Sequence, residues 1–266
     1  MDTGGEHSEQ QMKQSRWGFR GKTVWNWLEL LIVPLALAVI GLWFTTQQET
    51  RQQQIENQRA EAERELAQQR AQDESLQAYL DQMSTLMLEK DLRNSEEDSE
   101  VRTLARARTL TVLKRLDPSR KEEIMNFLVE ADLVRGVGQS APVIALGGAD
   151  LQNTWMIGAD LRGADLSLAH LEGAELASAE LRGADMTVAS LDKADLYNAD
   201  LRDANLFAVN LEGAYLRDAD LRGANLNLVK LKGAYGWTED QLNEAENLKG
   251  ATMPNGQKYE DWIKDR

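Results

Sequence analysis

The feature that most constrains the fold of this chain is a five-residue period that runs without insertion from residue 149 to residue 233. These 85 residues make seventeen units, from ADLQN and TWMIG at the start to ANLNL and VKLKG at the end. The third position is Leu in fifteen units and Met in two, and the first position is Ala in fourteen. Neither the helical period of about 3.6 residues nor the strand period of about 2 produces this pattern.

A short fixed period with one large and one small apolar residue per unit predicts a solenoid in which each unit forms one side of a coil. Four sides use twenty residues, so residues twenty apart stack, with parallel backbone hydrogen bonds about 4.8 Å from coil to coil. We therefore expect about four coils in a rod roughly 20 Å long. The leucines should fill the interior, and one predicted core column is Leu161, Leu181, Leu201 and Leu221.

The A-[DN]-L-x-x pattern of units such as 159–163 (ADLRG) and 204–208 (ANLFA) resembles the pentapeptide repeat family. The resemblance covers about a third of the chain. It implies a right-handed, four-sided β-helix. It implies no single activity, although some members of the family act as DNA-shaped inhibitors or protectors of type II topoisomerases.

Folding the sequence at twenty residues separates two charge ladders on what we call side one. The arginine ladder is Arg162, Arg182, Arg202 and Arg222, and the acid ladder two residues earlier is Asp160, Glu180, Asp200 and Asp220. Adjacent opposite columns compensate one another, which is the favoured interpretation, and an electrostatic docking surface is the alternative. Side three carries Glu172, Asp192, Glu212 and finally Lys232, whereas side four has no single character.

Side two carries a column of apolar residues at the fifth position of its units. This apolar strip consists of Leu168, Val188, Ala208 and Leu228, with Phe207 beside them. A continuous apolar strip on the outside of a solenoid favours a covering partner. The helices expected over 94–140 are the preferred cover, and a second copy or a different protein are the alternatives.

Residues 25–44 form an apolar stretch with no polar side chain from Leu30 to Phe44. Twenty helical residues span about 30 Å, the thickness of a bilayer core, and Trp25, Trp27 and Trp43 lie at its two ends. We predict a single transmembrane helix. A cleaved signal peptide and a buried soluble helix are the alternatives.

The order of Lys and Arg around this stretch favours a cytoplasmic N-terminus and an extracytoplasmic C-terminal domain. Four precede the stretch closely, and Arg51 and Arg59 follow it.

Helix-forming residues fill 45–93, which contains neither Gly nor Pro. A heptad pattern that is best between Leu76 and Met87 predicts either an oligomeric coiled coil or a helix that packs once on its own domain. Residues 94–140 are expected to form a helical pair, with Ser95 or Ser99 capping the first helix and Asp117-Pro118 in the turn.

The expected organisation has six parts. These are a disordered tail (1–24), a transmembrane helix (25–44), a long helix or coiled coil (45–93), a helical pair (94–140), the solenoid (141–237), and a C-terminal helix and cap (238–266). A capping box from Thr238 to Gln241 opens the last helix, and Trp237 and Met253 are expected to plug the open end of the solenoid.

Composition argues against several classes of function. The formal net charge of −14 disfavours direct binding of nucleic acid, and the absence of cysteine excludes thiol chemistry and Cys-type metal sites. With only His7 and His170, no two-histidine metal motif can form. We find no nucleophile–base pair, phosphate loop or metal cluster, and so expect no enzyme activity, no cofactor and no small-molecule substrate.

The sequence therefore predicts a membrane-anchored scaffold that binds a protein partner or a second copy of itself. Two alternatives are an acidic, DNA-mimicking binder of a type II topoisomerase and a purely mechanical spacer.

Overall fold

A computed structural model describes residues 24–136 and 140–265. The chain divides into two units, Met1–Leu66 and Ala67–Arg266. Residues 1–23 of the expected tail, and the side chains of Trp25 and Trp27, lie outside the described residues.

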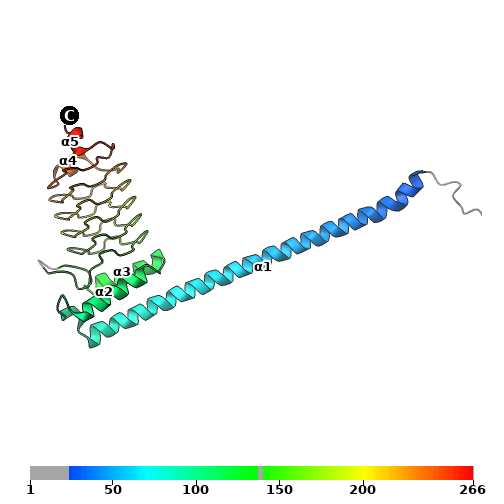
Figure 1. Ribbon diagram of the computed structural model, residues 1–266, viewed down its shortest axis with the longest axis horizontal. Coiled ribbons are helices and arrows are strands. Elements are labelled where there is room, and N and C mark those ends of the chain that lie inside the picture. The colour runs from blue at the N-terminus through cyan, green and yellow to red at the C-terminus, as the bar shows by residue number, and fades with distance from the viewer. Residues whose placement is uncertain (1–23, 137–139, 266) are drawn as a thin grey trace, which may run out of the picture. The chain divides into compact units, whose positions relative to one another are not determined.

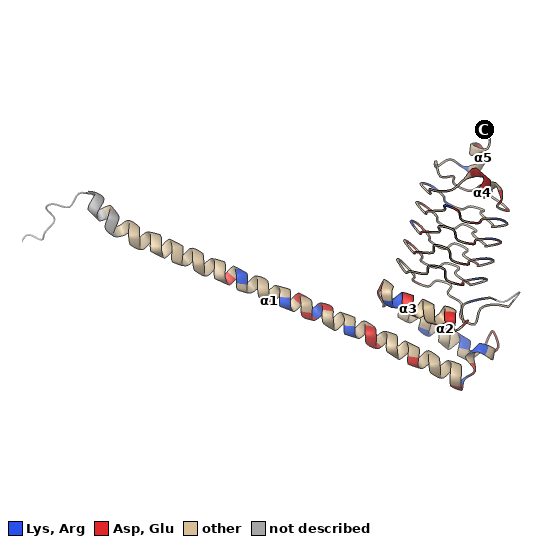
Figure 2. Cartoon of the chain, turned by 180° about the vertical axis from the view of Figure 1, so that it is seen from behind, with Lys and Arg blue, Asp and Glu red and all other residues tan. Residues whose placement is uncertain are grey.

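Helix α1 (Val24–Glu89) is continuous, with Pro34 inside it, and its first part is the apolar stretch. The described side chains from residue 31 to residue 44 are all exposed, and this part of α1 carries no charged residue (Figure 2). Among the described residues, α1 is the one helix long and apolar enough to cross a membrane, with a mean hydropathy of 1.5 in its most apolar window. The resemblance of this part of α1 to a membrane span rests on its length and composition.

The last turns of α1 pack on the helical pair in the second unit. Leu76 and Met83 are buried in the core together with Leu113 of α2 (Glu100–Leu113) and Ile124 of α3 (Pro118–Glu130). The apolar positions between Leu76 and Met87 thus pack within their own chain, the second of the two interpretations that the heptad pattern allowed. A short 3-10 helix, η1 (Leu92–Asn94), joins α1 to α2.

Local chemistry starts both helices of the pair. The Ser99 hydroxyl accepts a hydrogen bond from the backbone N–H of Arg102 at the start of α2, and the Asp117 carboxylate does the same for Arg120 at the start of α3. Pro118 occupies the first turn of α3, where its missing N–H costs nothing.

The solenoid consists of stacked coils (Figure 1), and residues twenty apart are joined by parallel bridges, as between Asp160 and Glu180. In the described residues these contacts are isolated parallel bridges rather than continuous strands. Only the second residue of each unit forms a bridge to the neighbouring coil. The fourth and fifth residues already form the turn into the next side. Every interior leucine of the predicted column is at most 1% exposed.

The helical pair closes the first coil. Figure 1 shows α2 and α3 at this end of the stack, and the backbone of Gly136 donates to the carbonyl of Arg162 at 2.9 Å. A Cβ on Gly136 would lie 2.5 Å from the carbonyl oxygen of Gly163, so only glycine permits this approach.

The other end is closed by α4 (Glu239–Asn243) and the loop that follows it. Gln241 completes the expected capping box with Thr238 and also donates to the carbonyl oxygens of Leu216 and Ala219 at 3.0 and 2.8 Å. Met253 is fully buried and Trp237 is partly buried against the core.

The coil continues past residue 237, where the repeat was expected to end. Leu226 donates to the carbonyl of Asn247, and Gly233 donates to that of Pro254, both at 2.9 Å. The loop therefore adds part of a further coil after the interruption by α4. A last helix, α5 (Tyr259–Trp262), follows.

Candidate interaction surface

Each unit of the solenoid ends in a β-turn, and the fifth residue of the unit has a positive φ. The turn is closed by a hydrogen bond from the first residue of the next unit to the third residue, as from Ala169 to Leu166 at 3.1 Å. Glycine, Asn or Asp occupies most of these positions on the other sides, since such residues tolerate the left-handed region.

The apolar strip occupies this same turn position along the corner between sides two and three. Leu168, Val188, Ala208 and Leu228 have φ values of 59°, 59°, 55° and 58°. Bulky and β-branched residues are disfavoured in this conformation. The turn column of side two therefore holds residues that local backbone preference would not select.

The strip is open to solvent. Leu168 is 61% exposed, Val188 48%, Leu228 49% and Phe207 37%. The preferred expectation, that the 94–140 helices cover the strip, is wrong: α2 and α3 pack on the open end of the first coil, where apolar interior needs covering more. At its last coil the strip meets the C-terminal loop, since a Cβ on Gly250 would lie 2.6 Å from Cδ2 of Leu228.

The two ladders of side one pair with each other. In three coils the arginine Nε donates to Oδ1 of the aspartate two residues earlier. The distances are 2.8 Å from Arg162 to Asp160, 2.8 Å from Arg202 to Asp200, and 2.9 Å from Arg222 to Asp220. Glu180, one methylene longer, contacts Arg162 of the preceding coil at 3.0 Å, and Arg182 turns instead to Asp203 at 3.0 Å. This arrangement is self-compensating.

These contacts shift the pKa values of the acids on side one. Hydrogen bonding from Arg162 lowers the pKa of Asp160 to about 2, and hydrogen bonding from Arg202 and Arg222 lowers the pKa values of Asp200 and Asp220. The carboxylates thus remain ionised at any ordinary pH, and they have no spare proton to offer in acid–base chemistry.

Asp and Asn recur at the second position of a unit for a local reason that the sequence analysis did not find. In the inner coils, as in residues 194–198, the backbone N–H of the fourth residue has no backbone acceptor, whereas those of the other four residues do. The side chain of the second residue accepts from it, as Asp195 does from Tyr197 at 2.8 Å and Asn205 from Phe207 at 3.3 Å. This Asx-turn holds the corner in place.

Side four carries aromatic residues that the sequence analysis did not recognise as a group. The rings of Tyr215 and Tyr235, twenty residues apart, stack at 4.8 Å, and the ring of Tyr197 stacks on Tyr215 at 6.2 Å. Trp155 and Ile157 on the first coil are 60% and 64% exposed. The twenty-residue register stacks Tyr215 on Tyr235, both at the second position of their units, and Tyr197 joins them from the fourth position of the preceding coil.

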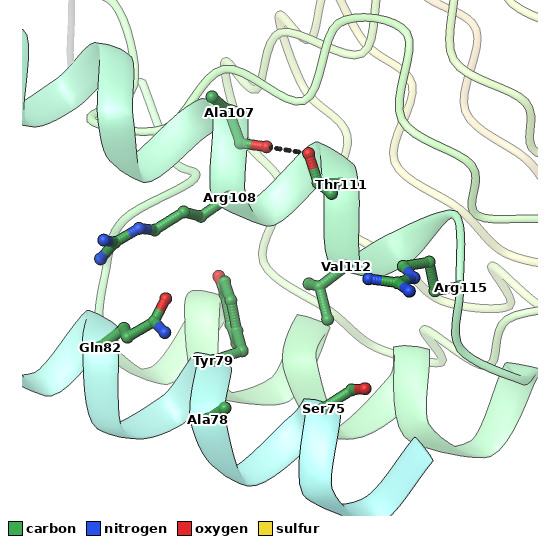
Figure 3. A pocket seen from close by; sticks show the side chains of 9 residues that line it. All are labelled: Ser75, Ala78, Tyr79, Gln82, Ala107, Arg108, Thr111, Val112 and Arg115. Carbon is green, nitrogen blue, oxygen red and sulfur yellow. Dashed lines mark hydrogen bonds between the residues drawn. The ribbon is translucent and has the colours of Figure 1, made fainter. Parts of the chain in front are cut away.

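A groove of about 380 Å³ lies between α1 and α2 (Figure 3). Tyr79 lies in it, with its hydroxyl 2.9 Å from that of the buried Thr109, and burial raises the pKa of Tyr79. Arg108 and Arg115 project on either side. Ser75 and Thr111 in the groove bond to carbonyls of their own helices and have no base beside them, so the groove offers no activated nucleophile.

No group of three or more His, Asp or Glu side chains in the described part of the chain is placed to hold a metal ion.

Comparison with protein families identifies the solenoid. Residues 146–179, 169–206 and 199–235 match the family of pentapeptide repeats, with eight copies of its repeat. A match to this family implies a right-handed β-helix. Comparison with the curated proteins gives no match.

Several solved structures are similar to parts of this chain. HetL, a pentapeptide repeat protein involved in the regulation of heterocyst differentiation in the cyanobacterium Nostoc sp. strain PCC 7120, is 34% identical over 44% of this chain and 56% of its own, with a TM-score of 0.37. The present chain thus spans little more than half of the HetL structure.

Two further similar structures come from other settings. A pentapeptide repeat protein of the Arabidopsis thaliana thylakoid lumen is 28% identical over 46% of this chain and 88% of its own, with a TM-score of 0.35. QnrB1, a plasmid-mediated fluoroquinolone resistance protein, is 22% identical over 43% of this chain and 71% of its own, with a TM-score of 0.28. At such TM-scores neither structure informs the role of this chain.

Proposed function

Because residues 146–235 belong to the pentapeptide repeat family, we propose that this protein is a membrane-anchored, non-enzymatic scaffold that uses its solenoid to bind a protein partner. The apolar strip on side two is the proposed contact surface. The observation that carries the proposal is the combination, at the same positions, of solvent exposure and left-handed backbone in Leu168, Val188 and Leu228.

Two independent physical terms disfavour these side chains in the isolated chain. Exposed apolar area is unfavourable in water, at roughly 25 cal/mol per Å². A left-handed conformation costs about 1–2 kcal/mol for an ordinary L-residue. Positions where a sequence departs from local preference without compensation in its own fold are characteristic of functional surfaces.

The first part of α1 supports the anchor. Its exposed apolar side chains from residue 31 to residue 44 would be poorly accommodated in water but match the hydrocarbon core of a bilayer. Lys13, Arg16, Arg20 and Lys22 before the apolar stretch, against Arg51 and Arg59 after it, favour a cytoplasmic N-terminus and an extracytoplasmic solenoid.

A non-enzymatic role is supported by the character of the surfaces. The charged groups of side one are paired with one another on a convex wall, and catalysis requires groups that converge on a concave site.

One alternative is a role as an acidic mimic of DNA that binds a type II topoisomerase. Residues 149–233 carry fourteen Asp and Glu and eight Lys and Arg, a net charge of 8 − 14 = −6. The pairing of Arg162, Arg202 and Arg222 with the acid ladder opposes it, because a DNA mimic needs unneutralised carboxylates. An extracytoplasmic solenoid would also be separated from chromosomal enzymes. A purely mechanical spacer would leave the apolar strip without a purpose.

Matched glycine substitutions test the scaffold function. The double variant Leu168→Gly and Val188→Gly removes two strip side chains from turns in which glycine is the preferred residue, so the coil should keep its stability. The control is Ser178→Gly and Asn198→Gly, at the same turn position of side four in the corresponding coils.

The readout is crosslinking of the tagged full chain in its own membrane with an amine-reactive reagent, followed by capture and sizing of the products. We expect the strip variant to lose at least tenfold of a discrete product that the wild type and the control both give. Equal products from all three proteins, or none from any, would overturn the scaffold proposal.

A further inference from the structure

We propose that the occupant of the apolar strip is the same strip of a second copy of this chain, with the two solenoids antiparallel. This inference rests on the proposed function and names its partner. Four observations carry it: the sequence of the strip along the axis, the charge polarity beside it, the absence of ion-pair partners for the lysines in the described residues, and the small size of the surface.

The strip is nearly palindromic along the solenoid axis. The turn position of side two reads Gly148, Leu168, Val188, Ala208, Leu228 and Gly250 from the first coil to the C-terminal loop. An interface with two-fold symmetry requires a surface that is complementary to itself. When the copies are antiparallel, Leu168 faces Leu228 of the second copy, and the larger Val188 faces the smaller Ala208.

The residues beside the strip carry opposite charges at its two ends. Around Leu168 and Val188, sides two and three carry mainly acids: Asp165, Glu172, Asp185 and Asp192. The basic exceptions are Lys193, next to Asp192, and Arg106 of α2, which donates to the carbonyl of Gly147 at 3.3 Å. At the level of Leu228 and beyond they carry Lys230, Lys232 and Lys249, whereas Lys258 and Glu260, both bound to Gly250, offset each other.

This polarity selects the antiparallel arrangement. A parallel pair would place the acidic ends of the two copies together and the basic ends together, which is unfavourable within the Debye length of about 8 Å. The antiparallel pair places the acidic end of each copy against the basic end of the other, and the one unfavourable level on side three is the middle one, where Asp192 of one copy meets Glu212 of the other. It also brings Glu172 of one copy to the level of Lys232 of the other, because both occupy the fourth position on side three.

Several of these charges have no charged partner in their own chain, whereas Glu172 already contacts Nδ1 of His170 at 3.3 Å. Lys230, Lys232 and Lys249 form no ion pair within the described residues. Asp185 accepts hydrogen bonds only from uncharged groups in that part of the chain, those of Thr187 and Asn205. Side one differs, since its charges are already compensated.

The surface is small, which fits a tethered copy better than a freely diffusing partner. Three coil spacings of about 4.8 Å separate Leu168 from Leu228, so the strip is only about 14 Å long. Stable complexes between free proteins bury about 1,200–2,000 Å². Anchoring two copies in one membrane raises their effective concentration and allows a weak contact to form.

Cysteine crosslinking in the membrane tests both the partner and the orientation, and the chain has no cysteine of its own. The variants are Ser167→Cys and Asn227→Cys, which occupy the fourth position of side two beside Leu168 and Leu228. In an antiparallel pair, residue 167 of one copy faces residue 227 of the other, while identical positions lie about three coil spacings apart. A disulfide requires Cα atoms within about 7 Å.

We expect a homodimer band, after oxidation or a short bis-maleimide, when the two variants are expressed together, and at least a tenfold weaker band from either variant alone. Strong bands from each single variant would show a parallel pair and overturn the inference. Absence of any homodimer band would overturn it as well.

The glycine variant of the strip distinguishes a failure of the self-pairing inference from a failure of the proposed scaffold function. If Leu168→Gly with Val188→Gly still abolishes the crosslinked product while the cysteine pair gives no homodimer, the strip binds a different protein. The scaffold function then stands and self-pairing falls.

A charge exchange provides a second test that does not touch the strip. Lys232→Glu should lower the yield of the mixed cysteine pair several-fold, and Glu172→Lys added in the same chain should restore it, because each copy supplies both residues. A yield that responds to neither change, or that falls further in the double variant, would contradict the antiparallel register.

Discussion

The ammonium group of Lys121 lies 2.7 Å from Oδ1 of Asp150, and this ion pair joins α3 to the first coil of the solenoid. The lysine is 5% exposed, whereas the aspartate reaches the surface. A buried charge without its partner is strongly destabilising, so the pair fixes where the helical pair sits on the coil.

We expect Asp150→Ala to destabilise the second unit by about 2 kcal/mol, because it leaves the ammonium of Lys121 buried without a charged acceptor. Urea unfolding of the full chain in detergent, followed by circular dichroism, measures this change. The double variant Lys121→Met and Asp150→Ala should recover much of the loss. A double variant as unstable as the single one would contradict this explanation.

The Asx-turn gives a second prediction, on the solenoid itself. Asp195→Ala removes the acceptor for the backbone N–H of Tyr197 and should cost about 1 kcal/mol in the free energy of unfolding. Asp195→Asn keeps a side-chain oxygen in the same place and should cost much less. Equal losses from the two variants would show that charge rather than the turn contact matters at this position.

The paired ladders predict an acid-dependent loss of stability. The pKa of Asp160 is about 2 in the folded chain, and those of Asp200 and Asp220 are also lowered, whereas an unfolded Asp titrates near about 3.9. The stabilisation that these three carboxylates supply is therefore present above about pH 4 and is lost as the pH falls below it, towards about 2 in the case of Asp160.

The measurement is the melting temperature of the full chain between about pH 6 and pH 2. In the variant with Arg162, Arg202 and Arg222 each changed to Gln, this acid-dependent fall should become smaller. Lys193→Gln, which removes a charge outside the ladders, should leave it unchanged. A fall of the same size in the ladder variant would contradict the assigned cause.

The proposed membrane anchor predicts a position-dependent effect of charge in α1. Leu37→Arg with Ile40→Arg places two charges in the apolar stretch, and each opposes insertion by about 3 kcal/mol. We expect most of the variant protein to be released from membranes by alkaline carbonate. The control, Ile55→Arg with Leu66→Arg in the polar part of the same helix, should stay bound. Equal extraction of both variants would argue against a membrane span.

The sequence predicted the coil because every residue that faces the interior is repeated. The third residue of each unit must be large and apolar, and residues twenty apart must stack, so the period contains the geometry that the bridges later show. The starts of α2 and α3 could also be predicted from local sequence, because the hydroxyl of Ser99 and the carboxylate of Asp117 each bond to a backbone N–H within one turn of the chain.

Other features depend on distant contacts and could not be predicted. The final part-coil retains Leu248 and Met253 as interior residues, but α4 interrupts the five-residue period before them. The pattern also could not decide whether Leu76 and Met83 meet a second copy or their own helical pair. The exposure of the strip was not predicted, because the helices of residues 94–140 were expected to cover it. In the structure these helices pack on the open end of the first coil instead.

The most direct test of the central claim, that the apolar strip is the contact surface, uses a photoreactive amino acid in the full chain, expressed in intact cells. It replaces Leu168 in one variant and Asp218 in another, which share the turn position but lie on sides two and four. We expect the variant at 168 to give a discrete crosslinked protein product on illumination and the variant at 218 to give at least tenfold less. Equal yields at the two positions, or no product at 168, would contradict the claim.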